Sequence, residues 1–74
     1  MRRLRRSTRS VDRTPTVRER EVMRLAAKGL TNRAIAHELN VTEGTIKLHL
    51  HNIYRKLAIN SRFALAALVN RKAS

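Results

Sequence analysis

Apolar residues recur along this chain at the three- and four-residue spacing that is typical of half-buried helices. The clearest case is the stretch TEGTIKLHLHNIYRKL, which begins at Thr42. One narrow stripe of this stretch consists of Ile46, Leu50, Ile53 and Leu57. The opposite side is basic and has no acid in its middle. The pattern predicts a helix with one face in a core and the other face free to meet a negatively charged partner.

Residues typical of helix ends divide the chain into four predicted helices. Thr16 and Glu19 form a capping-box pattern, and Gly29 can take the positive φ that ends a helix. Thr31 and Thr42 are predicted N-caps. We therefore expect an all-α domain with helices at about 17–28, 32–39, 43–57 and 61–71.

The second and third predicted helices are joined by a tight connection at Asn40 and Val41. Two helices joined in this way, with an apolar turn residue in the core, are typical of a helix-turn-helix. The inward positions of the first two helices are predicted to be Val22, Leu25, Ala26, Ile35, Ala36 and Leu39.

The fourth predicted helix carries apolar residues on two sides. One arc is expected to pack on the other helices and comprises Ala64, Leu65, Leu68 and Val69. A second arc comprises Phe63, Ala66 and Ala67. This second arc is either a surface for a partner or the place where Phe63 closes the edge of the core.

Net charge narrows the class of partner. The 74 residues include 17 Lys and Arg against five Asp and Glu, a net charge of +12. Such an excess indicates a polyanion, most often nucleic acid, although a solvated basic surface without a partner stays open. One Phe and one Tyr are too few for the stacking platforms that bind single strands. Duplex DNA is the expected partner, because a helix over 43–57 has a size that suits the major groove.

The first 14 residues are rich in arginine and serine and show no periodicity. We expect a disordered basic arm over 1–14 that follows phosphates or enters a minor groove, or else a linker remnant, with the domain at 15–74. A transmembrane helix and a secretory signal are not predicted, because the longest apolar run is short. The expected location is the cytoplasm.

The sequence predicts neither catalysis nor a cofactor or metal site. Cysteine is absent, and no glycine-rich phosphate loop or H-E-x-x-H pattern occurs. The five acids form no obvious pair. His49 and His51 point in different directions on one helix, so they cannot hold one ion together.

Three motifs resemble a known family. They are R-E-R-E-V, K-G-L-T-N-R-A-I-A and T-E-G-T-I-K-x-H-x-x-N-I-x-x-K-L, all between Thr16 and Ser61. This segment resembles the LuxR/FixJ/NarL-type helix-turn-helix, which usually forms the C-terminal output domain of bacterial response regulators and quorum-sensing receptors. Ala58 departs from that pattern, which commonly has Gly there.

The resemblance implies a sequence-specific transcriptional regulator whose third helix enters the major groove, and a homodimer formed through the fourth helix. The implied base contacts, which the helical wheel also places outward, are Lys47, Leu48 and His51. The implied phosphate contacts are Thr31, Asn32, Arg33, Thr45, Asn52, Arg55 and Lys56. The expected dimer surface comprises Phe63, Ala66, Ala67 and Asn70.

Two alternatives remain open at this point. Region 4 of a bacterial sigma factor also has a capped first helix and a G-T-I-K-type third helix. A basic module that docks on an acidic protein surface, for example of RNA polymerase, is the alternative from another class. Salt separates this module from a DNA reader, whose affinity falls by about 0.9 log units per log of salt for each phosphate neutralised.

Overall fold

A computed structural model of the chain describes residues 14–73, and the side chains of residues 14–71. Four helices form this part of the chain: α2 (Val17–Ala27), α3 (Asn32–Leu39), α4 (Glu43–Leu57) and α5 (Arg62–Ala73). The predicted all-α fold is confirmed, and each predicted helix end lies within two residues of the observed one. The predicted arm, apart from Thr14, lies outside the described residues.

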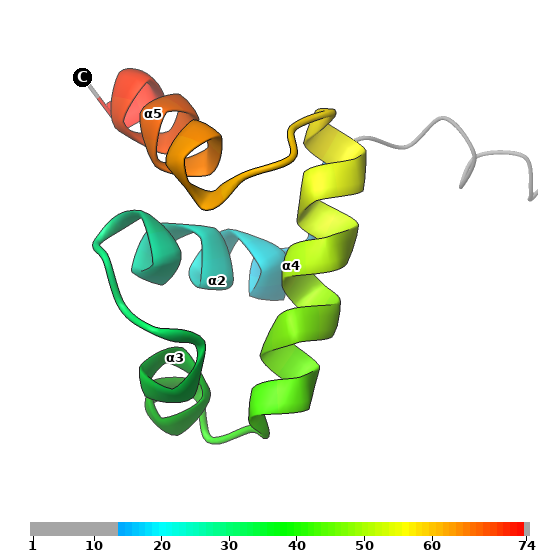
Figure 1. Cartoon of the computed structure of the whole chain (residues 1–74), viewed down its shortest axis with the longest axis vertical. Coiled ribbons are helices and arrows are strands. Elements are labelled where there is room, and N and C mark those ends of the chain that lie inside the picture. The colour runs from blue at the N-terminus through cyan, green and yellow to red at the C-terminus, as the bar shows by residue number, and fades with distance from the viewer. Residues whose placement is uncertain (1–13, 74) are drawn as a thin grey trace, which may run out of the picture.

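Helix α2 occupies the centre of the fold. It packs against α3, α4 and α5, and α3 also packs against α4 (Figure 1). The side chains with the least exposure come from all four helices and are Val22, Ile35, Ile46, Ile53 and Leu65. A single small core therefore fixes α4 against α2 and α3.

Each helix is preceded by a residue whose side-chain hydroxyl accepts a hydrogen bond from a backbone N–H three residues later. These residues are Thr16, Thr31, Thr42 and Ser61, with oxygen–nitrogen distances of 3.1 Å. At α2 the bond is reciprocal, because the Thr16 N–H donates to Glu19 Oε1 at 2.9 Å. The predicted caps are confirmed, and Ser61 caps the fourth helix. They satisfy N–H groups that a helix start leaves unpaired.

Left-handed residues follow three of the helices. Gly29 has φ 97°, Asn40 has φ 59° and Ala58 has φ 57°. Glycine and asparagine adopt this region readily, whereas alanine is disfavoured there by about 1–2 kcal/mol. The left-handed conformation of Ala58 therefore costs free energy in the turn after α4. The family that this chain resembles commonly has glycine at this position.

Burial agrees with the predicted stripes at most positions but differs at a few. Met23 is buried although it was not among the predicted core residues, and Leu39 and Leu57 are only half-buried. Phe63 is 85% exposed. The alternative in which Phe63 closes the edge of the core is therefore wrong, because a ring in that position would be largely covered.

Candidate nucleic-acid interface

Helix α4 has two chemically different faces. Ile46 and Ile53 are completely buried, and Leu50 nearly so. The other side is exposed at Gly44, Lys47, Leu48, His51 and Arg55. We call these five residues the outer face of α4. The core therefore fixes which way this face points.

The predicted base-contacting residues lie together on the outer face. Leu48 keeps 59% of its surface exposed. Lys47 and His51 flank it, one and three positions away, and both are exposed. The three side chains offer a cation, a methyl-rich surface and an imidazole to whatever approaches.

The N-terminus of α4 is held by two threonines. The Thr45 N–H donates to Thr42 Oγ1, and the two hydroxyl groups are 2.9 Å apart. The predicted phosphate contact at Thr45 thus has its hydroxyl engaged within the cap. The residue itself is half-buried.

The other predicted phosphate contacts are in varied surroundings. Thr31, Arg33 and Arg55 are exposed, while Asn32 and Asn52 are half-buried. Thr31 is the N-cap of α3, so the free N–H groups of that helix end lie beside it. A helix N-terminus of this kind favours an anion.

Lys56, the last predicted phosphate contact, points inward. Its ammonium donates to Glu19 Oε1 at 2.7 Å and lies 3.5 Å from the Thr14 carbonyl oxygen. Burial raises the pKa of the Glu19 carboxyl, but hydrogen bonds from Lys56 and the Thr16 backbone outweigh it, so the pKa lies below its ordinary value of 4.5. A phosphate contact by Lys56 would require this ion pair to open.

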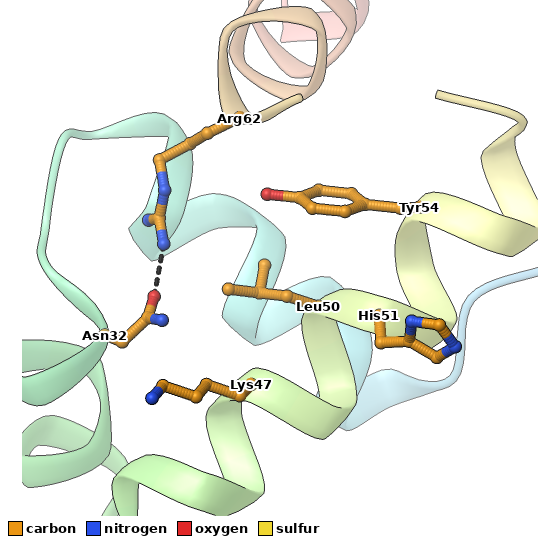
Figure 2. A pocket seen from close by; sticks show the side chains of 6 residues that line it. All are labelled: Asn32, Lys47, Leu50, His51, Tyr54 and Arg62. Carbon is orange, nitrogen blue, oxygen red and sulfur yellow. Dashed lines mark hydrogen bonds between the residues drawn. The ribbon is translucent and has the colours of Figure 1, made fainter. Parts of the chain in front are cut away.

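Figure 2 shows a hollow beside the outer face that brings together three of the predicted residues. Asn32 comes from the start of α3, and Lys47 and His51 from α4. The remaining lining residues are Leu50, Tyr54 and Arg62. Tyr54 and Arg62 were not among the residues predicted to contact DNA.

Arg62 is joined to the start of the helix-turn-helix. Its guanidinium donates through Nη1 to the Leu30 carbonyl oxygen at 3.0 Å and through Nη2 to Asn32 Oδ1 (Figure 2). One feature of the sequence could have indicated a role for Arg62. A cation in the first turn of a helix is unfavourable beside the positive end of the helix dipole, which suggests that Arg62 makes a specific contact.

The outer side of α5 carries the predicted dimer surface. Phe63, Ala67 and Asn70 are exposed, and Ala66 is half-buried. Helix α5 packs on α2 through its other side, where Leu65 is completely buried. The exposed ring of Phe63 is thus left without a partner among residues 14–71.

Two further findings concern the described part of the chain. None of its helices is both long enough and apolar enough to span a bilayer. Within the same residues, no three histidine or acidic side chains gather as they would around a metal ion.

Comparisons with known proteins agree with this architecture. The sequence model of the bacterial regulatory proteins of the luxR family (GerE) matches residues 15–69. The nitrate/nitrite response regulator NarL of Escherichia coli K12 is 39% identical over 57 residues, which is 77% of this chain and 26% of NarL. NarP of the same strain is 45% identical over 53 residues, 72% of this chain and 25% of NarP.

A solved structure, that of the response regulator StyR, is similar with a TM-score of 0.75 and 40% identity. The match covers 85% of this chain and 32% of the StyR chain. The present chain thus spans about a quarter to a third of the length of these proteins. From the match over residues 15–69 and the four-helix fold, this chain belongs to the luxR family of bacterial regulatory proteins and carries its helix-turn-helix DNA-binding domain.

Proposed function

We propose that this domain regulates transcription by reading a specific duplex sequence with the outer face of α4. The observation that carries the proposal is the exposure of Lys47, Leu48 and His51 on one side of a helix whose other side is locked in the core. Helix α4 has 15 residues, so it is roughly 22 Å long. The major groove, about 12 Å wide, admits such a helix.

Each of the three side chains suits a different feature of base edges. Lys47 can donate to guanine O6 or N7, and Leu48 can contact a thymine methyl group. His51 can donate to a base acceptor or to a phosphate. Phosphates on either side would be held by the residues Thr31, Asn32, Arg33, Thr45, Asn52 and Arg55, and by Lys56 if it leaves Glu19. These phosphate contacts would set the register without adding sequence information.

Lys47→Ala is expected to lower the discrimination between a selected duplex and a random one by roughly 1–3 kcal/mol. The reason is that a base contact is lost only on the selected sequence, whereas a phosphate contact is lost on both. Binding sites are first selected from a random duplex pool, and both affinities are then measured at one salt concentration.

The matched control for Lys47 is Lys28→Ala. Lys28 is an exposed cation at the end of α2, away from α4's outer face, and carries the same charge. Loss of the Lys28 side chain should lower the affinity for both duplexes by the same small factor. An equal loss of both affinities in Lys47→Ala would assign that side chain to a phosphate instead of a base.

We further propose that two copies bind a two-fold site through the outer side of α5, which carries Phe63, Ala66, Ala67 and Asn70. The support is the exposed ring of Phe63 next to small alanines, since an exposed aromatic beside small residues allows close packing of a second helix. The proposed place of action is the bacterial cytoplasm, where an acidic surface of RNA polymerase would be a compatible second partner.

Phe63→Asp is expected to abolish cooperative occupancy of two half-sites about 34 Å apart while leaving single half-site binding nearly unchanged. A carboxylate in the middle of an apolar contact would be desolvated without a counter-charge. Band-shift titrations on duplexes with one and two half-sites measure the effect. Val17→Asp is the control, because Val17 is also exposed but lies on α2. Unchanged cooperativity in Phe63→Asp would remove α5 from the interface.

A further inference from the structure

The hollow beside α4 has the composition of an anion site. It measures about 290 Å³, and its lining residues are Asn32, Lys47, Leu50, His51, Tyr54 and Arg62, with no acid among them. Since about 10–15 Å³ of such volume holds one water molecule, the hollow has room for a tetrahedral oxyanion. Two side chains that carry a full positive charge, Lys47 and Arg62, meet here from two different helices.

The charge of Arg62 is held in place but not neutralised. Both groups that accept its hydrogen bonds, the Leu30 carbonyl and the Asn32 amide oxygen, are uncharged. A guanidinium has five N–H donors, and these two bonds leave others available. Arg62 also stands in the first turn of α5, where the helix dipole adds to the positive potential. Without an acid nearby, this arrangement favours a mobile anion.

Tyr54 adds a hydroxyl group to the same hollow. Its half-buried ring packs against the core, and its hydroxyl is directed toward Arg62 (Figure 2). No residue among 14–71 forms a hydrogen bond with that hydroxyl. The hydroxyl is therefore free to donate to an acceptor that enters the hollow.

We propose that this hollow seats one phosphate of the DNA backbone, with Arg62 and Tyr54 as phosphate ligands. The inference rests on the proposed function, because Lys47 and His51 line both the hollow and the outer face of α4. A backbone phosphate bordering the groove that α4 enters would therefore lie next to the hollow. Through Arg62, the start of α5 would contact the duplex directly, and this contact would fix the tilt of the domain on its site.

The test is the salt dependence of duplex binding by the full chain and its Arg62→Gln and Tyr54→Phe variants. Arg62→Gln should reduce the magnitude of the slope of log affinity against log salt by about 0.9. It should also weaken binding on the order of tenfold at moderate salt, on selected and random duplexes alike. Tyr54→Phe removes one uncharged donor, so it should weaken both duplexes a few-fold without changing the slope.

The control is Arg24→Gln, which removes the same charge from an exposed position on α2 outside the hollow. A second readout uses the selected duplex with single phosphates replaced by neutral methylphosphonates. At the phosphate that occupies the hollow, the replacement should weaken DNA binding by the parent chain but not by the Arg62→Gln variant. Melting curves check that both variants fold. If Arg62→Gln does not fold, Tyr54→Phe still tests the site, because it keeps the aromatic ring that packs against the core.

A third readout titrates inorganic phosphate into the DNA-free chain and follows the side-chain amide of Asn32 by NMR. A shift there, together with the altered slope, supports the proposal. A shift without any change in the salt slope or in the methylphosphonate response of Arg62→Gln would mean that the hollow binds free phosphate only. That result would overturn the proposal. Parent and variants that bind DNA identically would overturn it while leaving the proposed function intact. Failure of the parent chain to bind any duplex would instead refute the proposed function.

Discussion

Glu19→Ala is expected to lower the free energy of unfolding by about 3–5 kcal/mol. Glu19 is 5% exposed and is the only buried charged residue among residues 14–71. Its carboxylate accepts from the Thr16 N–H at one end of α2 and from Lys56 Nζ near the end of α4. Removing it leaves the Lys56 ammonium without a counter-ion and takes away half of the capping box.

This loss is large relative to the stability of so small a domain. About 60 ordered residues give a total of roughly 3–9 kcal/mol. The side chain of Lys56 retains 20% exposure, so water would relieve part of the penalty and place the effect near the lower end of the range. The variant should therefore be partly unfolded at room temperature, as urea titration followed by circular dichroism would show.

The same ion pair predicts how stability depends on pH. The pKa of Glu19 is lower in the folded chain than its ordinary value of 4.5, which unfolding would restore. The resulting stabilisation is fully present above that value, and it is lost as pH falls through the lower folded pKa. The melting temperature of the parent chain should thus decline as the pH falls below the ordinary value of 4.5. In Glu19→Gln that decline should be smaller, because the amide does not titrate.

Glu21→Ala provides the matched control on the same helix. Glu21 pairs with Arg18 at 3.2 Å, but both side chains are well exposed and three residues apart. Exposed helical pairs of this kind contribute about 0.3–0.5 kcal/mol. Equal destabilisation by the two substitutions would show that the Glu19–Lys56 pair has no special weight in the fold.

The helices were predictable from the sequence because their determinants are local. A cap such as Thr31 acts on the N–H of Ala34, three residues away, and Asn40 ends α3 through its own backbone conformation. The apolar stripe of α4 likewise depends only on spacing within one helix. The outward direction of Lys47 and Leu48 follows from that stripe, so the exposure of the proposed reading face was also predictable.

Contacts between distant positions could not be predicted in this way. Glu19 and Lys56 lie 37 residues apart, and Arg62 lies 30 residues after Asn32. No pattern in the sequence specifies which cation reaches which acceptor once four helices have packed. Lys56 was therefore grouped with the phosphate contacts by resemblance, whereas the fold directs it to Glu19. The hollow at Arg62 and Tyr54 depends on the same kind of long-range packing.

Ile53→Ala and Leu48→Ala should separate stability from DNA reading on a single helix. Ile53 is completely buried on the inner face of α4, so its truncation is expected to reduce the free energy of unfolding by about 2–5 kcal/mol. The remaining folded molecules keep the outer face unchanged and should retain their preference among duplexes. At low temperature, or with a stabilising osmolyte, Ile53→Ala should therefore discriminate sequences as the parent chain does.

Leu48→Ala should show the opposite behaviour. Leu48 is 59% exposed, so its truncation should change stability by no more than about 0.5 kcal/mol. If its methyl groups meet a thymine methyl, the preference for thymine at one position of the selected site should fall by roughly 1 kcal/mol. Melting curves and competition binding against single-base variants of the site measure the two effects separately. Should Leu48→Ala destabilise the fold as much as Ile53→Ala, the leucine would belong to the core, and α4 would present no apolar contact to the groove.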